Sequence, residues 1–101
     1  MLKITPTIEK KKALIALEGR LDTLTARDFD KTLMPILESV DEVVIDCKEL
    51  EYISSSGLRI FLTLRKAAAA KGGSVIVRSL NPDVRNVFMM TGFLNLFKIE
   101  G

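Results

Sequence analysis

The chain has 101 residues, 48 % hydrophobic and 28 % charged, which is the composition of one folded domain rather than of a disordered segment. The formal net charge is +2 and no aromatic residues interleave with the basic cluster Lys10–Lys12, so we expect a solvated turn there and no direct nucleic-acid or membrane partner. The absence of histidine excludes Ser-His-Asp and Cys-His nucleophile systems and imidazole metal sites.

The first elements read as two strands joined by a turn. Apolar residues at positions 2, 4 and 8 predict a half-buried strand, which the Lys10–Lys12 turn follows. Residues 13–17 form a continuous apolar run, which suits a strand buried on both faces and ended by Gly19. The turn predicts that this pair of strands is antiparallel.

A helix is predicted next. Thr25 is a good N-cap and Asp28, three residues later, completes a loose capping box. Pro35 falls inside the pattern and should kink the helix or disturb its last turn, because proline has no N–H to donate. The helix presents one apolar stripe: Ala26, Phe29, Leu33, Ile36 and Leu37.

A buried strand over residues 43–45 ends at Asp46-Cys47, and three serines, residues 54–56, then precede Gly57. The helix after Gly57 stops at Gly72-Gly73. Its apolar face comprises Ile60, Phe61, Leu64, Ala67 and Ala68.

The last part of the chain predicts a strand, a helix and an apolar tail. The strand spans residues 74–77, Asn81 caps the helix and Pro82 opens it. Gly92 ends the helix, and we expect residues 93–97 to pack back onto the core.

This order of elements predicts an α/β domain over residues 1–101. We expect a mainly parallel four-stranded sheet with an antiparallel first strand and helices mostly on one face. Sites in such sheets form where loops leave the carboxyl ends of the strands, so the loops at residues 19–25 and 49–56 should lie side by side.

The cysteine content and the lack of long apolar segments indicate the cellular compartment. Cys47 is the only cysteine, so the chain cannot form an intramolecular disulfide, and a reducing compartment is expected. The N-terminal residues show no signal peptide, and no apolar run reaches the roughly 18 residues that span a bilayer. We therefore expect a cytoplasmic protein.

Three serines before one helix exceed what capping requires. One serine satisfies an orphan N–H and contributes about 1 kcal/mol. Enzymatic and nucleotide-binding roles are poorly supported, because the chain has no Gly-x-Ser-x-Gly, Ser-x-x-Lys or phosphate-binding glycine motif. Phosphorylation fits better, because a helix N-terminus tolerates an anion while a docked partner would feel the added charge.

Several segments resemble a known family: residues 19–26, 44–46, 50–59 and 90–99. They resemble the STAS domain, and most closely the free-standing bacterial anti-sigma factor antagonists. The resemblance implies a non-catalytic regulator without cofactor or metal. When unphosphorylated, such a protein binds an anti-sigma factor that is also a serine kinase of the GHKL type, and the sigma factor is released. The kinase then phosphorylates the serine loop, and a PP2C-type phosphatase resets it.

The resemblance places the phosphoacceptor on Ser55. Ser56, beside Gly57, would cap the helix. Asp22 would orient the acceptor loop or the kinase, or else cap its own helix by local hydrogen bonds. Ser54 stands where the family has an aspartate, which makes it an alternative acceptor.

Docking residues and an alternative function remain open. Gly57 belongs to the acceptor loop, and Leu58 could contribute to a docking surface with Tyr52 and Arg59 or could lie in the core. The alternative function is a non-catalytic STAS scaffold within a larger signalling or transport complex.

Overall fold

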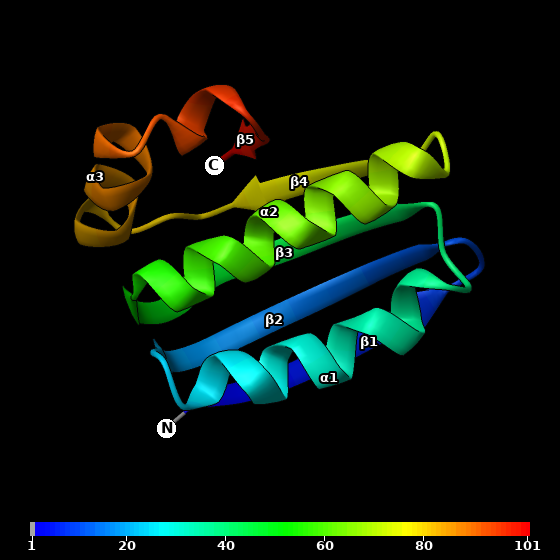
Figure 1. Ribbon diagram of the computed structural model, residues 1–101, viewed down its shortest axis with the longest axis horizontal. Helices are drawn as coiled ribbons and strands as arrows, with labels where there is room; N and C mark the ends of the chain where they lie inside the picture. Colours follow the sequence, from blue (N-terminus) through cyan, green and yellow to red (C-terminus); the bar gives the residue numbers. More distant parts are fainter. Residues whose placement is uncertain (1) are drawn as a thin grey trace.

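A computed structural model describes residues 2–101, and Met1, which the predicted domain includes, lies outside the described residues. Two helices, α1 (Thr25–Leu37) and α2 (Ser55–Ala70), lie side by side across one face of a sheet (Figure 1). A third helix, α3 (Pro82–Met90), lies beyond the arrowhead of β4 and leads into a short 3-10 turn, η1 (Phe93–Asn95). The strands are β1 (Leu2–Glu9), β2 (Lys12–Leu21), β3 (Glu42–Ile53), β4 (Ser74–Arg78) and β5 (Lys98–Glu100).

The sheet confirms the predicted fold class and adds one strand. Its five strands run in the order β1-β2-β3-β4-β5, with β1 antiparallel to β2 and every other pair parallel. The prediction of four strands missed β5, which is three residues long and carries a single apolar residue, Ile99. It pairs with residues 76–78 of β4 and places the apolar tail back on the domain.

Both central strands extend further than predicted. Gly19 was expected to end β2, but the strand continues to Leu21 through register shifts between Ala16 and Glu18 and between Gly19 and Arg20. Gly19 has a φ of 103°, which glycine adopts readily, so this residue marks a bulge rather than an end. Likewise β3 runs on to Ile53, so only the residues beyond Leu21 and Ile53 form the loops.

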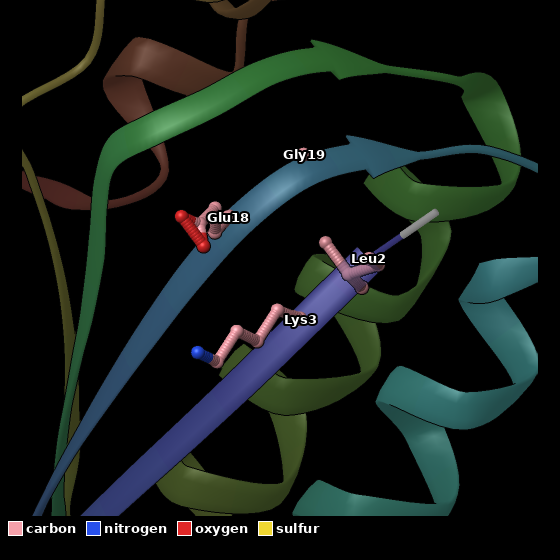
Figure 2. A pocket seen from close by; sticks show the side chains of 4 residues that line it. All are labelled: Leu2, Lys3, Glu18 and Gly19. Atoms are coloured by element: carbon pink, nitrogen blue, oxygen red, sulfur yellow. The ribbon is translucent and has the colours of Figure 1, made fainter.

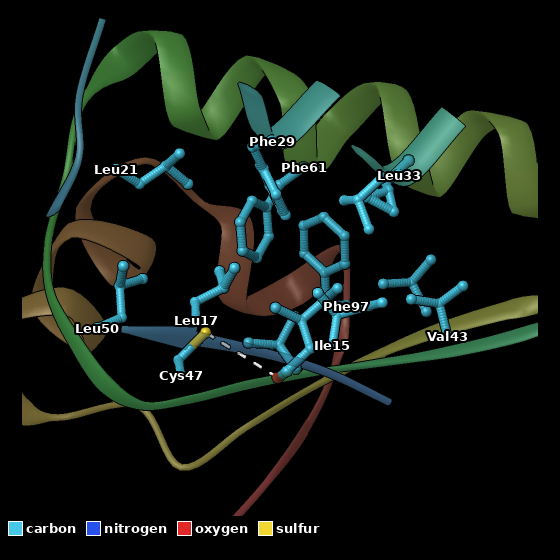
Figure 3. Packing of buried hydrophobic residues seen from close by; sticks show 14 of the residues in the cluster. Ile15, Leu17, Leu21, Phe29, Leu33, Val43, Cys47, Leu50, Phe61 and Phe97 are labelled. Carbon is cyan, nitrogen blue, oxygen red and sulfur yellow. Dashed lines mark hydrogen bonds between the residues drawn. The ribbon is translucent and has the colours of Figure 1, made fainter. Parts of the chain in front are cut away.

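The core lies between the sheet and the helices. Residues 13, 15 and 17 of β2 point into it and are at most 1 % exposed, whereas Leu14 and Ala16 are only half-buried. The expectation of a strand buried on both faces was therefore wrong, because the helices cover one face only. Phe61 of α2 lies at the centre of the core, with ring centroids 5.6 Å from Phe29 and 6.0 Å from Phe97 (Figure 3).

Two helix-end predictions are confirmed. The Asn81 side chain accepts a hydrogen bond of 2.8 Å from the Val84 N–H, and its amide donates one of 2.6 Å to the Leu50 carbonyl, which ties α3 to β3. Pro35 lies in the last turn of α1, where the Glu38 N–H bonds to the Pro35 carbonyl in a tightened turn. Across residues 2–101, no helix has the length and apolar character needed to cross a membrane.

Candidate functional site

The two predicted loops meet at the carboxyl ends of β2 and β3. The Ser54 N–H donates a hydrogen bond of 2.8 Å to the Leu21 carbonyl, which joins the start of one loop to the start of the other. Gly57 is buried, and a Cβ atom there would lie 2.7 Å from Leu21 Cγ and 3.0 Å from Ile53 Cγ1. The first turn of α2 therefore packs directly onto the ends of both strands, and a larger residue at position 57 would force the Leu21 side chain to shift.

Ser54, rather than Ser56, caps α2. Its backbone is extended, with φ −95° and ψ 173°, and its Oγ accepts a hydrogen bond of 3.2 Å from the Gly57 N–H. The prediction for Ser56 was wrong, because a cap side chain bonds to the N–H of the residue two or three positions later, and Ser56 is already helical. An aspartate fills the same role as a serine at an N-cap, so the family residue that Ser54 replaces stands at a capping position.

The other two serines differ in exposure. Ser55 is the first residue of α2 and is exposed, and no side chain or backbone group within residues 2–101 makes a hydrogen bond with its hydroxyl. Ser56 is half-buried and lies against a hollow between α1 and α2. Of the three hydroxyls, that of Ser55 is therefore the most open to a partner.

Asp22 caps α1 from the neighbouring loop. Its Oδ1 accepts hydrogen bonds from the Thr25 N–H at 3.0 Å and from the Leu24 N–H at 3.1 Å. The Thr25 amide, followed by the Thr25 hydroxyl, stabilises the carboxylate and holds the pKa of Asp22 below its ordinary value of 3.8. Thr25 was predicted to be the N-cap, but it is helical and its hydroxyl donates to the Arg20 carbonyl at 2.8 Å.

Of the two roles considered for Asp22, these bonds show local capping of its own helix. Its carboxylate is engaged within its own loop, so the structure places it as a local cap. The loop that it shapes presents Leu24 with its side chain 82 % exposed, close in sequence to the start of α1. Leu24 was not predicted to be a site residue. Its position outside the apolar stripe of α1 could have indicated that this leucine is exposed.

A surface hollow of about 280 Å³ lies between the first halves of α1 and α2. Sequence reasoning missed its contribution from α1, since Arg27 and Asp30 read as ordinary polar positions of an amphipathic helix. We call this hollow the interhelix groove, and its lining comprises Thr23, Ala26, Arg27, Asp30, Ser56, Arg59 and Ile60.

Two of the predicted docking residues are accessible and one is not. Arg59 is exposed, and Tyr52 is 40 % exposed with the Arg20 guanidinium 4.2 Å from its ring centroid. Leu58, left open between docking surface and core, is 7 % exposed and belongs to the core cluster. It is therefore unavailable as a docking contact in this conformation.

Two further features lie apart from the serines. Burial, followed by the charge of Asp46, raises the pKa of the Cys47 thiol to about 12, so this buried cysteine is unsuited to nucleophilic chemistry. A hollow of about 410 Å³ lies over the paired ends of β1 and β2 and is lined by Leu2, Lys3, Glu18 and Gly19 (Figure 2). None of the predicted site residues lines it.

Comparison with known proteins gives consistent matches. The family model of the STAS domain matches residues 2–101. An anti-sigma F factor antagonist of Paenibacillus polymyxa is 33 % identical over 91 residues, covering 85 % of this chain and 73 % of that protein. An anti-sigma-B factor antagonist of Bacillus subtilis is 26 % identical over 86 residues, covering 85 % of this chain and 79 % of that protein.

The fold also matches solved structures. The anti-sigma factor antagonist SpoIIAA in its unphosphorylated form superposes with a TM-score of 0.84 at 20 % identity, covering 98 % of this chain and 87 % of that one. The phosphorylated form of the Bacillus cell fate determinant SpoIIAA gives a TM-score of 0.78 at 19 % identity, covering 100 % of this chain and 91 % of that one. At such identities the likeness shows a shared fold.

Proposed function

The chain belongs to the STAS domain family, and we propose that it is an anti-sigma factor antagonist switched by phosphorylation of Ser55. Relatives named as anti-sigma factor antagonists support the general role, at identities up to 33 %. The observation that best supports the switch is that the three serines have different structural roles. Ser54 holds the helix cap, which leaves the exposed Ser55 hydroxyl free to be modified without loss of the cap.

In this proposal the unphosphorylated chain docks on an anti-sigma factor through the ends of β2 and β3 and the first turn of α2. The docking surface includes the exposed side chains of Leu24 and Tyr52 and the rim of the interhelix groove. Binding of the anti-sigma factor releases the sigma factor. The chain supplies a binding surface and a hydroxyl, and it performs no catalysis.

The partner is a serine kinase of the GHKL type that binds ATP and uses it as the phosphoryl donor. The Ser55 Oγ forms a bond to the γ-phosphorus, the bond from that phosphorus to ADP breaks, and the hydroxyl proton passes to a base of the kinase. A PP2C-type phosphatase later hydrolyses the phosphoserine, so that water restores the serine and inorganic phosphate leaves. Both enzymes must reach Ser55, and its exposure supports this requirement.

The magnitude of the switch follows from charge. A phosphate adds about 1.5 to 2 negative charges at pH 7 to a position that carries none. Docked against a desolvated or acidic surface, that charge can cost about 3–4 kcal/mol, which is roughly a hundredfold to a thousandfold in affinity. The fold survives, because an anion at the first turn of a helix is compatible with the helix dipole.

The experiment that tests the proposal is phosphorylation by the cognate anti-sigma factor kinase with ATP, followed by mapping of the product by mass spectrometry. We expect one phosphate on Ser55 and none in Ser55→Ala, while Ser54→Ala remains a substrate. Phosphate found only on Ser54, or on none of the three serines, would contradict the proposed acceptor. In the second case, unchanged binding of Ser55→Glu to the partner would indicate a constitutive scaffold instead.

A further inference from the structure

Two arginines of the interhelix groove have no carboxylate partner. The ion pairs within residues 2–101 join Lys12 to Glu42 at 3.8 Å and Arg78 to Asp46 at 3.4 Å. Arg27 of α1 and Arg59 of α2 line the groove without forming such a pair, although Asp30 also lines it. The groove therefore holds two positive charges, of which at least one is uncompensated.

Arg59 lies one helical turn after Ser55. Residues four apart on a helix have Cβ atoms about 5–6 Å apart, which is within reach of an arginine side chain. Long helical side chains also lean toward the helix N-terminus, so that each covers the turn before its own Cα. Arg59 is exposed and its side chain bonds to nothing else within residues 2–101, so it is free to extend over the turn that begins with Ser55.

We propose that Arg59 is the internal receptor of the Ser55 phosphate, which it binds through two guanidinium N–H groups. This inference rests on the proposed function, since it presupposes that Ser55 is the acceptor. Guanidinium matches phosphate in a bidentate geometry that lysine does not reproduce. Arg27 lines the same groove from α1 and provides a second positive charge there.

The internal contact gives phosphorylation a second effect besides repulsion. In the unphosphorylated chain the Arg59 guanidinium is available at the rim of the groove for a carboxylate of the partner. In the phosphorylated chain the same guanidinium is occupied by the phosphate of its own helix. One modification therefore adds a negative charge to the docking surface and withdraws a positive one from it.

The test needs no kinase, because phosphoserine can be placed at position 55 during translation. The second pKa of that phosphate, measured by ³¹P NMR, should lie below the usual value of about 6. We expect Arg59→Gln to raise it by about half a unit and Arg59→Lys to raise it less. The charged groups on the elements around this turn are Arg59 on its own helix, Arg27 and Asp30, which line the groove from α1, and Asp22 in the loop before α1.

The matched control is Lys66→Gln, which removes an exposed positive charge from the same helix two turns further on. It should leave the phosphate pKa unchanged, whereas Arg27→Gln should raise it by less than Arg59→Gln does. A phosphate pKa that is the same in the parent and in Arg59→Gln overturns the inference, as does an equal rise in the Lys66→Gln control. A failure of the kinase to modify Ser55 would instead count against the proposed function, because the phosphate in this test is installed without it.

Discussion

Removal of the Ser54 hydroxyl should destabilise the domain, whereas removal of its two neighbours should not. Ser54→Ala deletes the acceptor of the 3.2 Å bond from the Gly57 N–H and leaves that half-buried donor at a crowded helix start. Loss of a serine cap costs about 1 kcal/mol. Ser55 and Ser56 lie inside the first turn, where alanine is a better helix former than serine by a few tenths of a kcal/mol.

The assay is thermal unfolding of the parent and the three single alanine variants, followed by circular dichroism. For a domain of this length, a loss of about 1 kcal/mol corresponds to a fall in Tm of roughly 4–8 °C. We expect that fall for Ser54→Ala and a change of less than about 2 °C for the other two variants. Ser54→Asp should keep the parent Tm or exceed it, because a carboxylate both caps the helix and interacts favourably with its dipole.

The opposite pattern would refute this account of the serine run. If Ser56→Ala lowered the Tm while Ser54→Ala left it unchanged, Ser56 would be the cap. Ser54 would then be free to act as acceptor. The assignment of Ser55, rather than Ser54, as the acceptor would then lose its support.

Three further predictions concern buried or hydrogen-bonded groups near the site. Gly57→Ala should cost about 1–3 kcal/mol, because its Cβ would lie 2.7 Å from Leu21 Cγ; chemical denaturation should show this loss, and an equal loss in the exposed control Thr63→Ala would contradict it. The Cys47 thiol, with its pKa raised to about 12, should react with a thiol reagent at pH 8 only after unfolding; rapid reaction of the folded chain would show that the site is open. The lowered pKa of Asp22 contributes stability that is present above its ordinary value of 3.8 and is lost as pH falls through the lower folded value. The urea midpoint of the parent should therefore fall more between pH 7 and pH 3 than that of Asp22→Asn, and equal falls would contradict the capping role.

The fold class could be predicted because strands and helices alternate with clear periodicity, but the ends of β2 and β3 could not. Gly19 is a common strand terminator, and only the pairing with β3 shows that its φ of 103° accommodates a bulge. The strand β5 was missed for a different reason. It is stable only because residues 76–78 of β4 are present to pair with it, and three residues carry no periodic signal of their own.

The location of the site could be predicted from the sequence, but the roles of its individual residues could not. Motif spacing brought Asp22 and the serines to one edge of the sheet, and the bond between Ser54 and Leu21 confirms that placement. Which serine caps the helix depends on where the extended backbone of β3 changes to helix, and prediction of boundaries is uncertain by a residue or two. The interhelix groove depends on the relative positions of two helices, so no local pattern could have joined Arg27 to Arg59.

The central claim is that a phosphate on Ser55 releases the anti-sigma factor, and affinity measured with the phosphoserine protein tests it most directly. The cognate anti-sigma factor would be titrated by calorimetry with the parent, with Ser55→Ala and with the chain carrying phosphoserine at position 55. The account predicts that the parent and Ser55→Ala bind alike and that the phosphorylated chain binds at least a hundredfold more weakly. A Kd for the phosphorylated chain within twofold of the parent value would contradict it.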